Sequence, residues 1–148
     1  MKYIAYGANM SREQMALRCP TARFLSTGQL KGWQLEFYIH ATVTRVRNKE
    51  VYVPVAIWEI TAEDEKSLDQ FEGYPFYYTK QTTTVSLADG SQIKGMLYIM
   101  RELSRPYPPG SGYYRGIQEA YLDLGLGLEI KQALQPAYER SCTRAGRA

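Results

Sequence analysis

The clearest pattern along the chain is a strict alternation of apolar and polar positions between Trp33 and Val43. Successive side chains of a strand point to opposite faces of a sheet, so this alternation predicts a half-buried strand. The next run, from Val51 to Ile60, is apolar on both faces and contains Pro54. Proline cannot donate a backbone hydrogen bond, so we expect an edge strand or a strand with a bulge. The polar turn RNKE, residues 47–50, predicts that the two strands pair as a hairpin.

A second hairpin is predicted further along the chain. Residues 78–87 are rich in Thr and Val, and residues 92–100 return as another apolar run. Between them, Asp89-Gly90 is a signal for a type I′ turn. A short apolar run that stops at Gly7 predicts one more strand at the start of the chain.

Helical periodicity interrupts these strands. In the clearest case, apolar residues recur on one face between Tyr113 and Leu124. Strands in mostly antiparallel pairs, with helices between them but no regular alternation, indicate an α+β domain. We therefore predict a small, mixed, mostly antiparallel and β-barrel-like sheet with flanking helices. The expected helices span residues 11–18, 61–72, 113–124 and, as a shorter segment, 128–135.

Length and charge limit the classes that the chain can belong to. Its 148 residues fit one domain, expected at 1–138, followed by a flexible basic tail at 139–148. The net charge is +3, of which the tail supplies +2, so the rest of the chain is too weakly charged for nucleic-acid binding. The chain has no apolar run of membrane length and no signal-peptide pattern, so we expect a cytoplasmic protein without a membrane partner.

The composition also limits the chemistry. Cys19, Cys142 and the single histidine, His40, do not form a metal-binding set, and in the cytosol we expect no disulfide. His40 falls on the polar face of its predicted strand, where we expect a solvated residue. The unusual feature is the 13 tyrosines. Any chemistry is therefore expected to use carboxyl and phenol groups.

The stretch YGANM, residues 6–10, lies between the first strand and the first helix. Ser11 followed by Gln14 is a capping-box pattern, which predicts that the helix begins at Ser11. Gly7 can take backbone angles closed to other residues, so the loop can present consecutive N–H groups beside a helix N-terminus. Such a place attracts anions. The alternative is that Gly7 only turns the chain.

Glu72 is the second candidate. Thr61 and the acids after it predict a helix start, and Gly73 predicts its end, so Glu72 falls in the last turn. The helix C-terminus, the carboxylate of Asp69 and the neighbouring aromatic residues should all raise the pKa of Glu72. A carboxyl group of that kind can act as general acid and base. The alternative is a solvated glutamate at a helix end.

Three motifs carry a resemblance to a known family. YGANM follows an N-terminal strand, LDQFEGYPFYY follows a central helix, and PPGSGYY precedes a late helix. In this order and spacing they resemble the γ-glutamylcyclotransferase family, including its AIG2-like members, from about residue 3 to residue 125. The resemblance implies that Glu72 is the acid/base residue and that Asp69 is structural. It also implies substrate-binding positions at Tyr6, Gly7, Ala8, Asn9, Met10, Tyr78, Tyr98 and Tyr113.

The resemblance further implies how these residues act. The loop binds the γ-glutamyl part of the substrate largely through backbone amides, and the three later tyrosines exclude water and orient Glu72 with their hydroxyl groups. Family members usually have serine where this chain has Ala8, so a hydroxyl role is absent here while a backbone role survives.

The implied reaction is intramolecular and needs no cofactor and no metal. The free α-amino group of a γ-glutamyl unit attacks its own side-chain amide, closes 5-oxoproline and expels an amine or amino acid, as in glutathione metabolism. The expected partner is therefore a small molecule, and the enzyme is expected to be a monomer or homodimer. Two other classes remain: a non-catalytic module that binds a γ-glutamyl or other carboxylate ligand, and an interaction protein using the basic tip at residues 45–49 or the tail.

Overall fold

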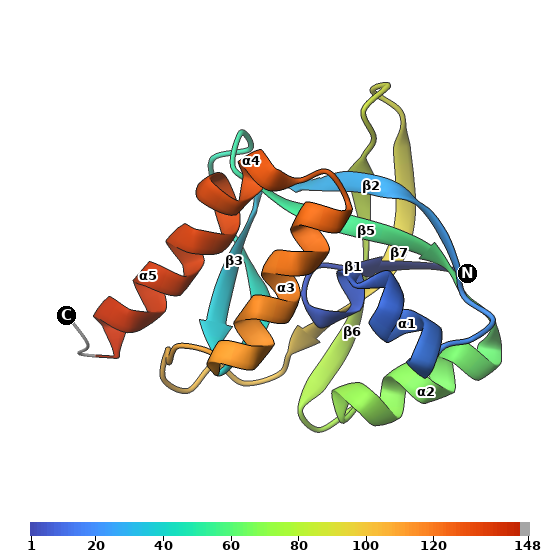
Figure 1. Cartoon of the computed structure of the whole chain (residues 1–148), viewed down its shortest axis with the longest axis horizontal. Coiled ribbons are helices and arrows are strands. Elements are labelled where there is room, and N and C mark those ends of the chain that lie inside the picture. Colours follow the sequence, from blue (N-terminus) through green and yellow to red (C-terminus); the bar gives the residue numbers. More distant parts are fainter. Residues whose placement is uncertain (146–148) are drawn as a thin grey trace.

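A closed five-stranded barrel forms the centre of the computed structural model, which describes residues 1–145 (Figure 1). Its neighbours are antiparallel except where the first strand meets the last in parallel, at Tyr3 and Met96. The predicted α+β class with a mostly antiparallel, barrel-like sheet is confirmed. In order around the barrel, the strands are β1 (Lys2–Ala5), β5 (Tyr52–Glu59), β2 (Arg23–Lys31), β6 (Tyr78–Ser86) and β7 (Gln92–Met100).

The alternating segment from Trp33 is a hairpin of its own and not one strand. It divides into β3 (Trp33–Tyr38) and β4 (His40–Arg45), which pair with each other as a separate two-stranded sheet. The chain reverses at Ile39, which has a positive φ of 68° and is 52% exposed. A period of two cannot reveal this reversal, because the turn residue occupies an apolar position and the alternation continues through it.

The predicted pairing of residues 33–43 with residues 51–60 is also wrong. β5 pairs with β2, and the β3–β4 hairpin is inserted between them. Gly32 closes the base of the insertion, since its N–H donates to Val51 O (2.8 Å) and its carbonyl accepts from Val46 N (3.0 Å). The φ of Gly32 is 80°, a value that glycine adopts without the steric cost that other residues pay.

β5 has neighbours on both sides over its second half, so the edge-strand prediction is wrong there. β1 covers only its second half, from Ala56 to Glu59, and Pro54 lies outside that range with Gln29 of β2 as its paired residue. The bulge lies on β2, between Phe24 and Ser26. Proline is therefore accommodated where β5 has a neighbour on one side only.

The second hairpin is confirmed, with β6 and β7 in register from Tyr78↔Met100 to Ser86↔Gln92. The type I′ prediction is wrong. The connection runs over residues 87–91, and only Gly90 has a positive φ, at 88°. A type I′ turn requires two successive residues of positive φ, and Asp89 does not supply one.

Local capping explains where two helices begin. Thr61 and Asp64 form a complete capping box at the start of α2. At α1 the box is half formed, because Ser11 Oγ accepts from Gln14 N (3.1 Å) while the Gln14 side chain accepts from Arg18 Nη2 (3.0 Å). The helices are α1 (Arg12–Arg18), α2 (Ala62–Glu72), α3 (Ser111–Asp123), α4 (Gly127–Glu129) and α5 (Gln135–Arg144), with a 3₁₀ turn η1 (Ala8–Met10) and a π-helical turn η2 (Ile130–Leu134).

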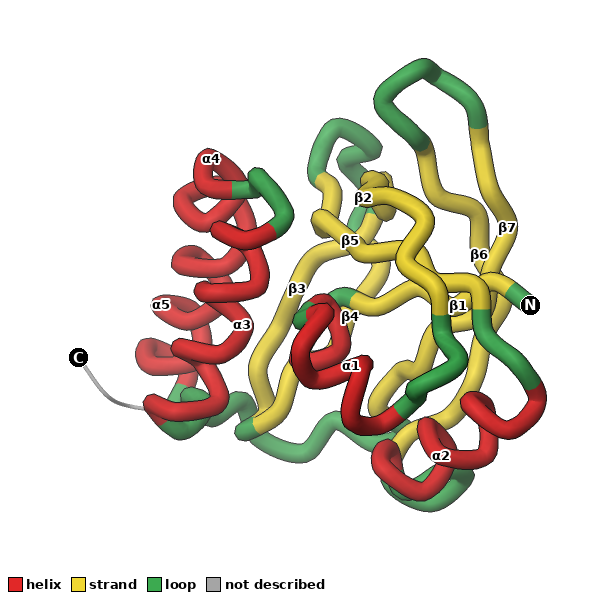
Figure 2. The backbone as a smooth tube through the Cα atoms, turned by 45° about the vertical axis from the view of Figure 1, so that its right-hand side comes forward, coloured by secondary structure: helices red, strands yellow, loops and turns green. Residues whose placement is uncertain are grey.

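The C-terminal helix corrects the predicted tail. Figure 2 shows α3, α4 and α5 grouped beside β3. Glu36 on β3 is buried, and it lies 3.6 Å from Arg140 Nε and 3.2 Å from Arg144 Nη1. The prediction of a flexible tail is wrong for residues 139–144, because a buried carboxylate on a distant strand holds the arginines. Ala145 is the C-cap of α5, and the remaining residues of the predicted tail, 146–148, lie outside the described residues.

Two further expectations concern residues 1–145 as a whole. Cys19 and Cys142 are both free thiols, so no disulfide joins them. In this part of the chain, no helix combines the length and the apolar character needed to cross a membrane.

Candidate functional site

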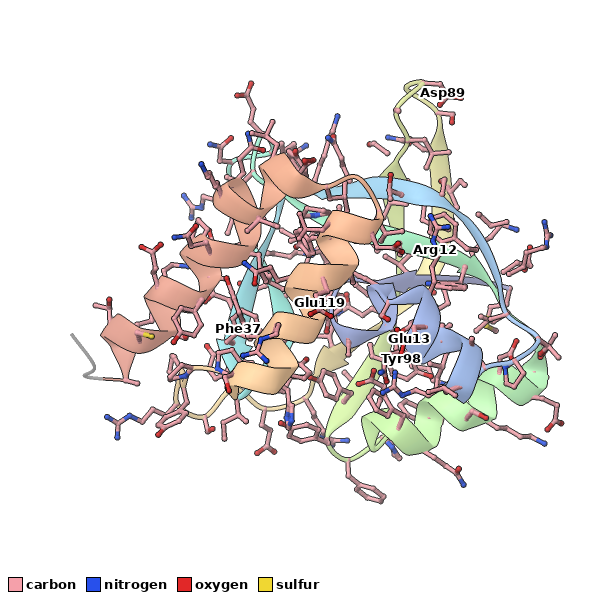
Figure 3. The ribbon with its side chains drawn as sticks, in the orientation of Figure 1. Arg12, Glu13, Phe37, Asp89, Tyr98 and Glu119 are labelled. Carbon is pink, nitrogen blue, oxygen red and sulfur yellow. The ribbon has the colours of Figure 1, made fainter. Side chains whose placement is uncertain are left out.

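A single large pocket of about 960 Å³ brings most of the predicted site residues together. It lies between the loop after β1, the helices α1 and α3, the end of α2 and the barrel strands β6 and β7. Figure 3 labels three residues of this region: Glu13 on α1, Glu119 on α3 and Tyr98 of the barrel strand β7. The predicted residues that line the pocket are Tyr6, Gly7, Ala8, Asn9, Glu72, Tyr78, Tyr98 and Tyr113.

Met10 is the predicted residue that does not line the pocket. Its side chain is fully buried in the core, and its N–H donates to Gly7 O (3.0 Å) within the 3₁₀ turn. The packing of an apolar side chain under the loop explains why methionine follows the loop. The binding role expected for Met10 is therefore replaced by a structural one.

The loop carries unused backbone donors. Among the described residues, the N–H groups of Gly7, Ala8 and Asn9 have no backbone or side-chain acceptor. Gly7 turns the chain with a φ of −126° and a ψ of −128°. It lies close to its neighbours, since a Cβ there would be 3.4 Å from Ala41 Cβ and 3.6 Å from Tyr113 Oη. Three successive free donors at a pocket wall suit a negatively charged oxygen.

Asn9 fixes this loop from beneath. It is 3% exposed, and its Nδ2 donates to Tyr3 Oη (3.0 Å) while its carbonyl accepts from Trp58 Nε1 (3.1 Å). Its Oδ1 accepts a hydrogen bond from Arg18 Nη1. The asparagine side chain thus acts inside the protein, and its backbone N–H is the part available to a ligand.

Glu72 is the last residue of α2 and is half-buried in the pocket. Burial raises its pKa to about 7, and the positive charge of Arg18 opposes this rise. No hydrogen bond or ion pair within residues 1–145 engages its carboxyl group. The carboxyl group can therefore exchange a proton with a ligand near neutral pH.

The sequence predicted that the negative charge of Asp69 would help to raise the pKa of Glu72, but the charge of Asp69 has no such effect. Asp69 Oδ1 accepts a hydrogen bond from Tyr98 Oη (2.6 Å) and lies 2.8 Å from Lys80 Nζ. Its negative charge is therefore compensated locally. Of the influences expected from the sequence, burial among aromatic residues is the dominant one.

The pocket tyrosines have partners other than Glu72. Tyr78 Oη donates to Ala41 O (2.6 Å), and Tyr6 Oη donates to Tyr98 O (2.6 Å). Burial raises the pKa of both phenols, so they stay neutral. The hydroxyl protons of Tyr78 and Tyr98 go to Ala41 O and Asp69, so these two phenols do not orient Glu72 as expected.

Tyr113 differs from the other predicted tyrosines. Its hydroxyl oxygen accepts from Ala41 N (3.1 Å), so its O–H proton remains available. Burial raises its pKa to about 12. Tyr113 is therefore a neutral hydrogen-bond donor at the pocket wall.

Several pocket residues were not predicted from the sequence. His40 was expected to be solvated; its ring is exposed, but Nδ1 lies 2.9 Å from Tyr77 Oη and the ring packs edge-on to Tyr113. The reversal at Ile39 places it there, and that reversal has no sequence signal. Arg18 also lines the pocket, although a basic residue in the last turn of a helix is explained by the helix dipole alone.

The outer end of the pocket is acidic. Glu13 of α1 and Glu119 and Asp123 of α3 line it, and Arg12 Nε lies 3.7 Å from Asp123 Oδ2. Figure 3 labels Arg12, Glu13 and Glu119 on the facing helices. In the part of the chain that the structure describes, no group of three or more His, Cys, Asp or Glu residues could hold a metal ion.

Comparison with known proteins agrees with this fold. The family model described as gamma-glutamyl cyclotransferase, AIG2-like, matches residues 3–116. The chain is 30% identical to a gamma-glutamylcyclotransferase of Bos taurus over 145 residues, covering 89% of this chain and 76% of the relative. It is 27% identical to the Homo sapiens gamma-glutamylcyclotransferase over 146 residues, covering 90% and 76%.

A solved structure gives the same result. The fold superposes on a structure named gamma-glutamyl cyclotransferase with a TM-score of 0.76, at 25% identity, covering 88% of this chain and 83% of the other. The family match spans more than half of the chain, and within it lie the free-amide loop, Glu72 and the pocket tyrosines. The chain belongs to the gamma-glutamyl cyclotransferase, AIG2-like family.

Proposed function

We propose that this protein is a γ-glutamylcyclotransferase that releases 5-oxoproline from a γ-glutamyl amino acid, peptide or amine. The observation that carries the proposal is one pocket that holds both a carboxyl group with a pKa of about 7, on Glu72, and a loop of unused amide donors, from Gly7 to Asn9. The first can move protons at neutral pH, and the second can stabilise a negatively charged oxygen.

The reaction begins at the substrate α-ammonium group. The Glu72 carboxylate accepts one proton from it, and the freed amine attacks the carbon of the γ-amide. The ring closes to a five-membered tetrahedral intermediate whose oxygen becomes negative. The attack also leaves a positive charge on the ring nitrogen, which still holds two protons. Glu72 returns its first proton to the leaving nitrogen as the carbon–nitrogen bond breaks, then takes the second proton from the ring nitrogen and passes it to the departing amine, which leaves as an ammonium ion. Both protons of the substrate ammonium group are thus transferred and no electrons are gained or lost, so the proposed chemistry requires no cofactor.

Proximity supplies much of the rate enhancement. A well-oriented intramolecular attack gains roughly 7 to 11 kcal/mol relative to a bimolecular one, so the pocket mainly has to fold the substrate back on itself. The loop amides hold either the substrate carboxylate or the developing oxyanion. A preorganised donor for such an oxyanion is worth about 3 to 4 kcal/mol.

The tyrosines shape the pocket in this scheme. Tyr78 and Tyr113 are both tied to the backbone of Ala41, which keeps their rings in place around the glutamyl chain. The rings exclude water, the competing nucleophile. Tyr113 can also donate its free O–H proton to a substrate oxygen.

The experiment that tests the proposal measures 5-oxoproline release from a panel of substrates. Because acidic side chains line the outer end of the pocket, the panel varies the charge of the leaving group: γ-glutamyl-alanine, glutathione, γ-glutamyl-lysine and γ-glutamylated amines. Turnover of at least one of them is expected. If none is turned over while 5-oxoproline still binds, the protein is a ligand-binding module on this fold.

A substitution then tests the role of the carboxyl group. Glu72→Gln should fold and bind 5-oxoproline but lose about 10²- to 10⁴-fold in kcat, the usual value of a general acid/base. Glu63→Gln is the matched control, because Glu63 lies on the same helix with an exposed side chain. Full activity in Glu72→Gln would rule out the proposed proton transfer.

A further inference from the structure

We propose that Arg18 is a positioning residue of this site, which holds the loop at residues 7–9 through the Asn9 side chain and places a fixed positive charge beside Glu72. The inference rests on the proposed function for its kinetic consequences. The contacts that carry it are independent of the reaction. Arg18 lies in the last turn of α1, between the loop and the end of α2.

The guanidinium group is held on three sides. Its Nη1 donates to Asn9 Oδ1, and its Nη2 donates to Gln14 Oε1 (3.0 Å). Its Cζ lies 3.6 Å from the ring centroid of Phe71, the residue before Glu72. A planar fork that hydrogen-bonds two acceptors while stacking on a ring is a geometry that lysine cannot reproduce.

The contact with Asn9 matters because Asn9 is almost fully buried. Without Arg18, its Oδ1 would lose its hydrogen-bond partner inside the protein, and an unpaired buried acceptor is unfavourable. The side chain would then reorient or draw in water. Because the free N–H groups of Ala8 and Asn9 belong to the same short turn, this reorientation would move the donors that we assign to the substrate.

The charge of Arg18 acts on the other half of the site. The groups that face Glu72 from the surrounding elements are Arg18 from α1 and six phenols, those of Tyr3, Tyr6, Tyr77, Tyr78, Tyr98 and Tyr113. Burial raises the pKa of each phenol, so all six are neutral. On its own helix, the charge of Asp69 is compensated by Lys80. Among the described residues, Arg18 is thus the cation that stabilises ionised Glu72.

Two substitutions separate the two roles. Arg18→Lys keeps the positive charge but loses the fork, and Arg18→Met keeps an apolar chain against Phe71 but loses both the charge and the hydrogen bonds. Lys66→Met is the control, because it removes an exposed positive charge from α2. If Arg18→Met does not fold, Arg18→Gln provides the same loss of charge with one remaining donor.

The first readout does not depend on turnover. The carboxyl carbon of Glu72 is followed by NMR as a function of pH in the free protein, and 5-oxoproline binding is measured by calorimetry. We expect the Glu72 titration to move upward by about one pH unit in Arg18→Met, and to stay near the wild-type position in Arg18→Lys. Binding should weaken about tenfold or more in both variants, since both lose the guanidinium group that joins Asn9 to Gln14.

The second readout is kinetic and uses a substrate that the wild type turns over. In Arg18→Met the acidic limb of the kcat/KM profile should move to higher pH with the NMR titration, while Arg18→Lys should show a raised KM with an unmoved limb. An unchanged Glu72 titration together with unchanged ligand binding in Arg18→Met would overturn the inference. If no substrate is turned over by any form, the proposed function fails, and the NMR and binding data still decide the role of Arg18.

Discussion

Tyr98 Oη and Asp69 Oδ1 share a hydrogen bond of 2.6 Å that joins the barrel strand β7 to the helix α2 that ends in Glu72. The same carboxylate lies 2.8 Å from Lys80 Nζ on β6. One acidic side chain therefore connects the helix to two strands. Because Lys80 compensates the charge of Asp69, this carboxylate does not raise the pKa of Glu72, although it lies only three residues away. Burial sets that pKa instead.

This arrangement predicts that Asp69→Asn destabilises the fold more than it impairs chemistry. The substitution removes a charge-assisted contact with Lys80, so the free energy of unfolding should fall by about 1 to 3 kcal/mol. Urea denaturation measures it, with Glu63→Gln as an exposed control on the same helix. A variant of unchanged stability that lacks turnover would instead assign Asp69 a direct part in the reaction.

The raised pKa of Glu72 predicts a pH-dependent stability. The ordinary value of 4.5 applies to the unfolded chain and about 7 to the fold, so the fold disfavours the ionised form. The stability linked to the neutral carboxyl group is fully present below pH 4.5 and is lost as the pH rises through 7. At about 1.4 kcal/mol per pH unit, the loss is about 3 kcal/mol.

Glu72→Gln should therefore be more stable than the wild type at pH 8 and similar to it at pH 4. Thermal unfolding at the two pH values measures the difference. If the melting temperatures of the two proteins differ by the same amount at both pH values, the carboxyl group does not have the raised pKa.

The alanine in the loop gives a third prediction. If the loop acts through its backbone, Ala8→Ser adds a hydroxyl group that no step uses, and kcat/KM should stay within about threefold of the wild type, a change of the size typical of neutral substitutions. Steady-state kinetics of 5-oxoproline release measure it. A rise of tenfold or more would show that a hydroxyl group contributes at this position.

The C-terminal helix gives a fourth prediction. Glu36 is only 4% exposed, so removal of its basic partners leaves a buried charge without compensation. A chain ending at Tyr138 should lose about 3 to 5 kcal/mol of unfolding free energy or fail to fold. Glu36→Gln in the shortened chain should recover part of this loss, as measured by urea denaturation. Equal stability of the full and shortened chains would restore the prediction of a flexible tail.

Local signals determined much of this protein from the sequence alone. The capping box at Thr61 sets where α2 begins, and Gly73, with its left-handed φ of 65°, sets where it ends, so the position of Glu72 followed from the residues around it. The β6–β7 hairpin likewise joins neighbouring segments. These features depend on hydrogen bonds and turns within a few residues, which sequence patterns record.

Tertiary structure alone decided which distant groups meet. The reversal at Ile39 moved His40 to the pocket, Ala41 became the shared partner of Tyr78 and Tyr113, and buried Glu36 ordered the helix read as a tail. In the same way Arg18 reached Asn9 and Phe71. Closing the barrel brings these residues together. The sequence does not record such contacts, because the pattern of neighbouring residues around a position is the same whether or not a distant partner lies beside its side chain.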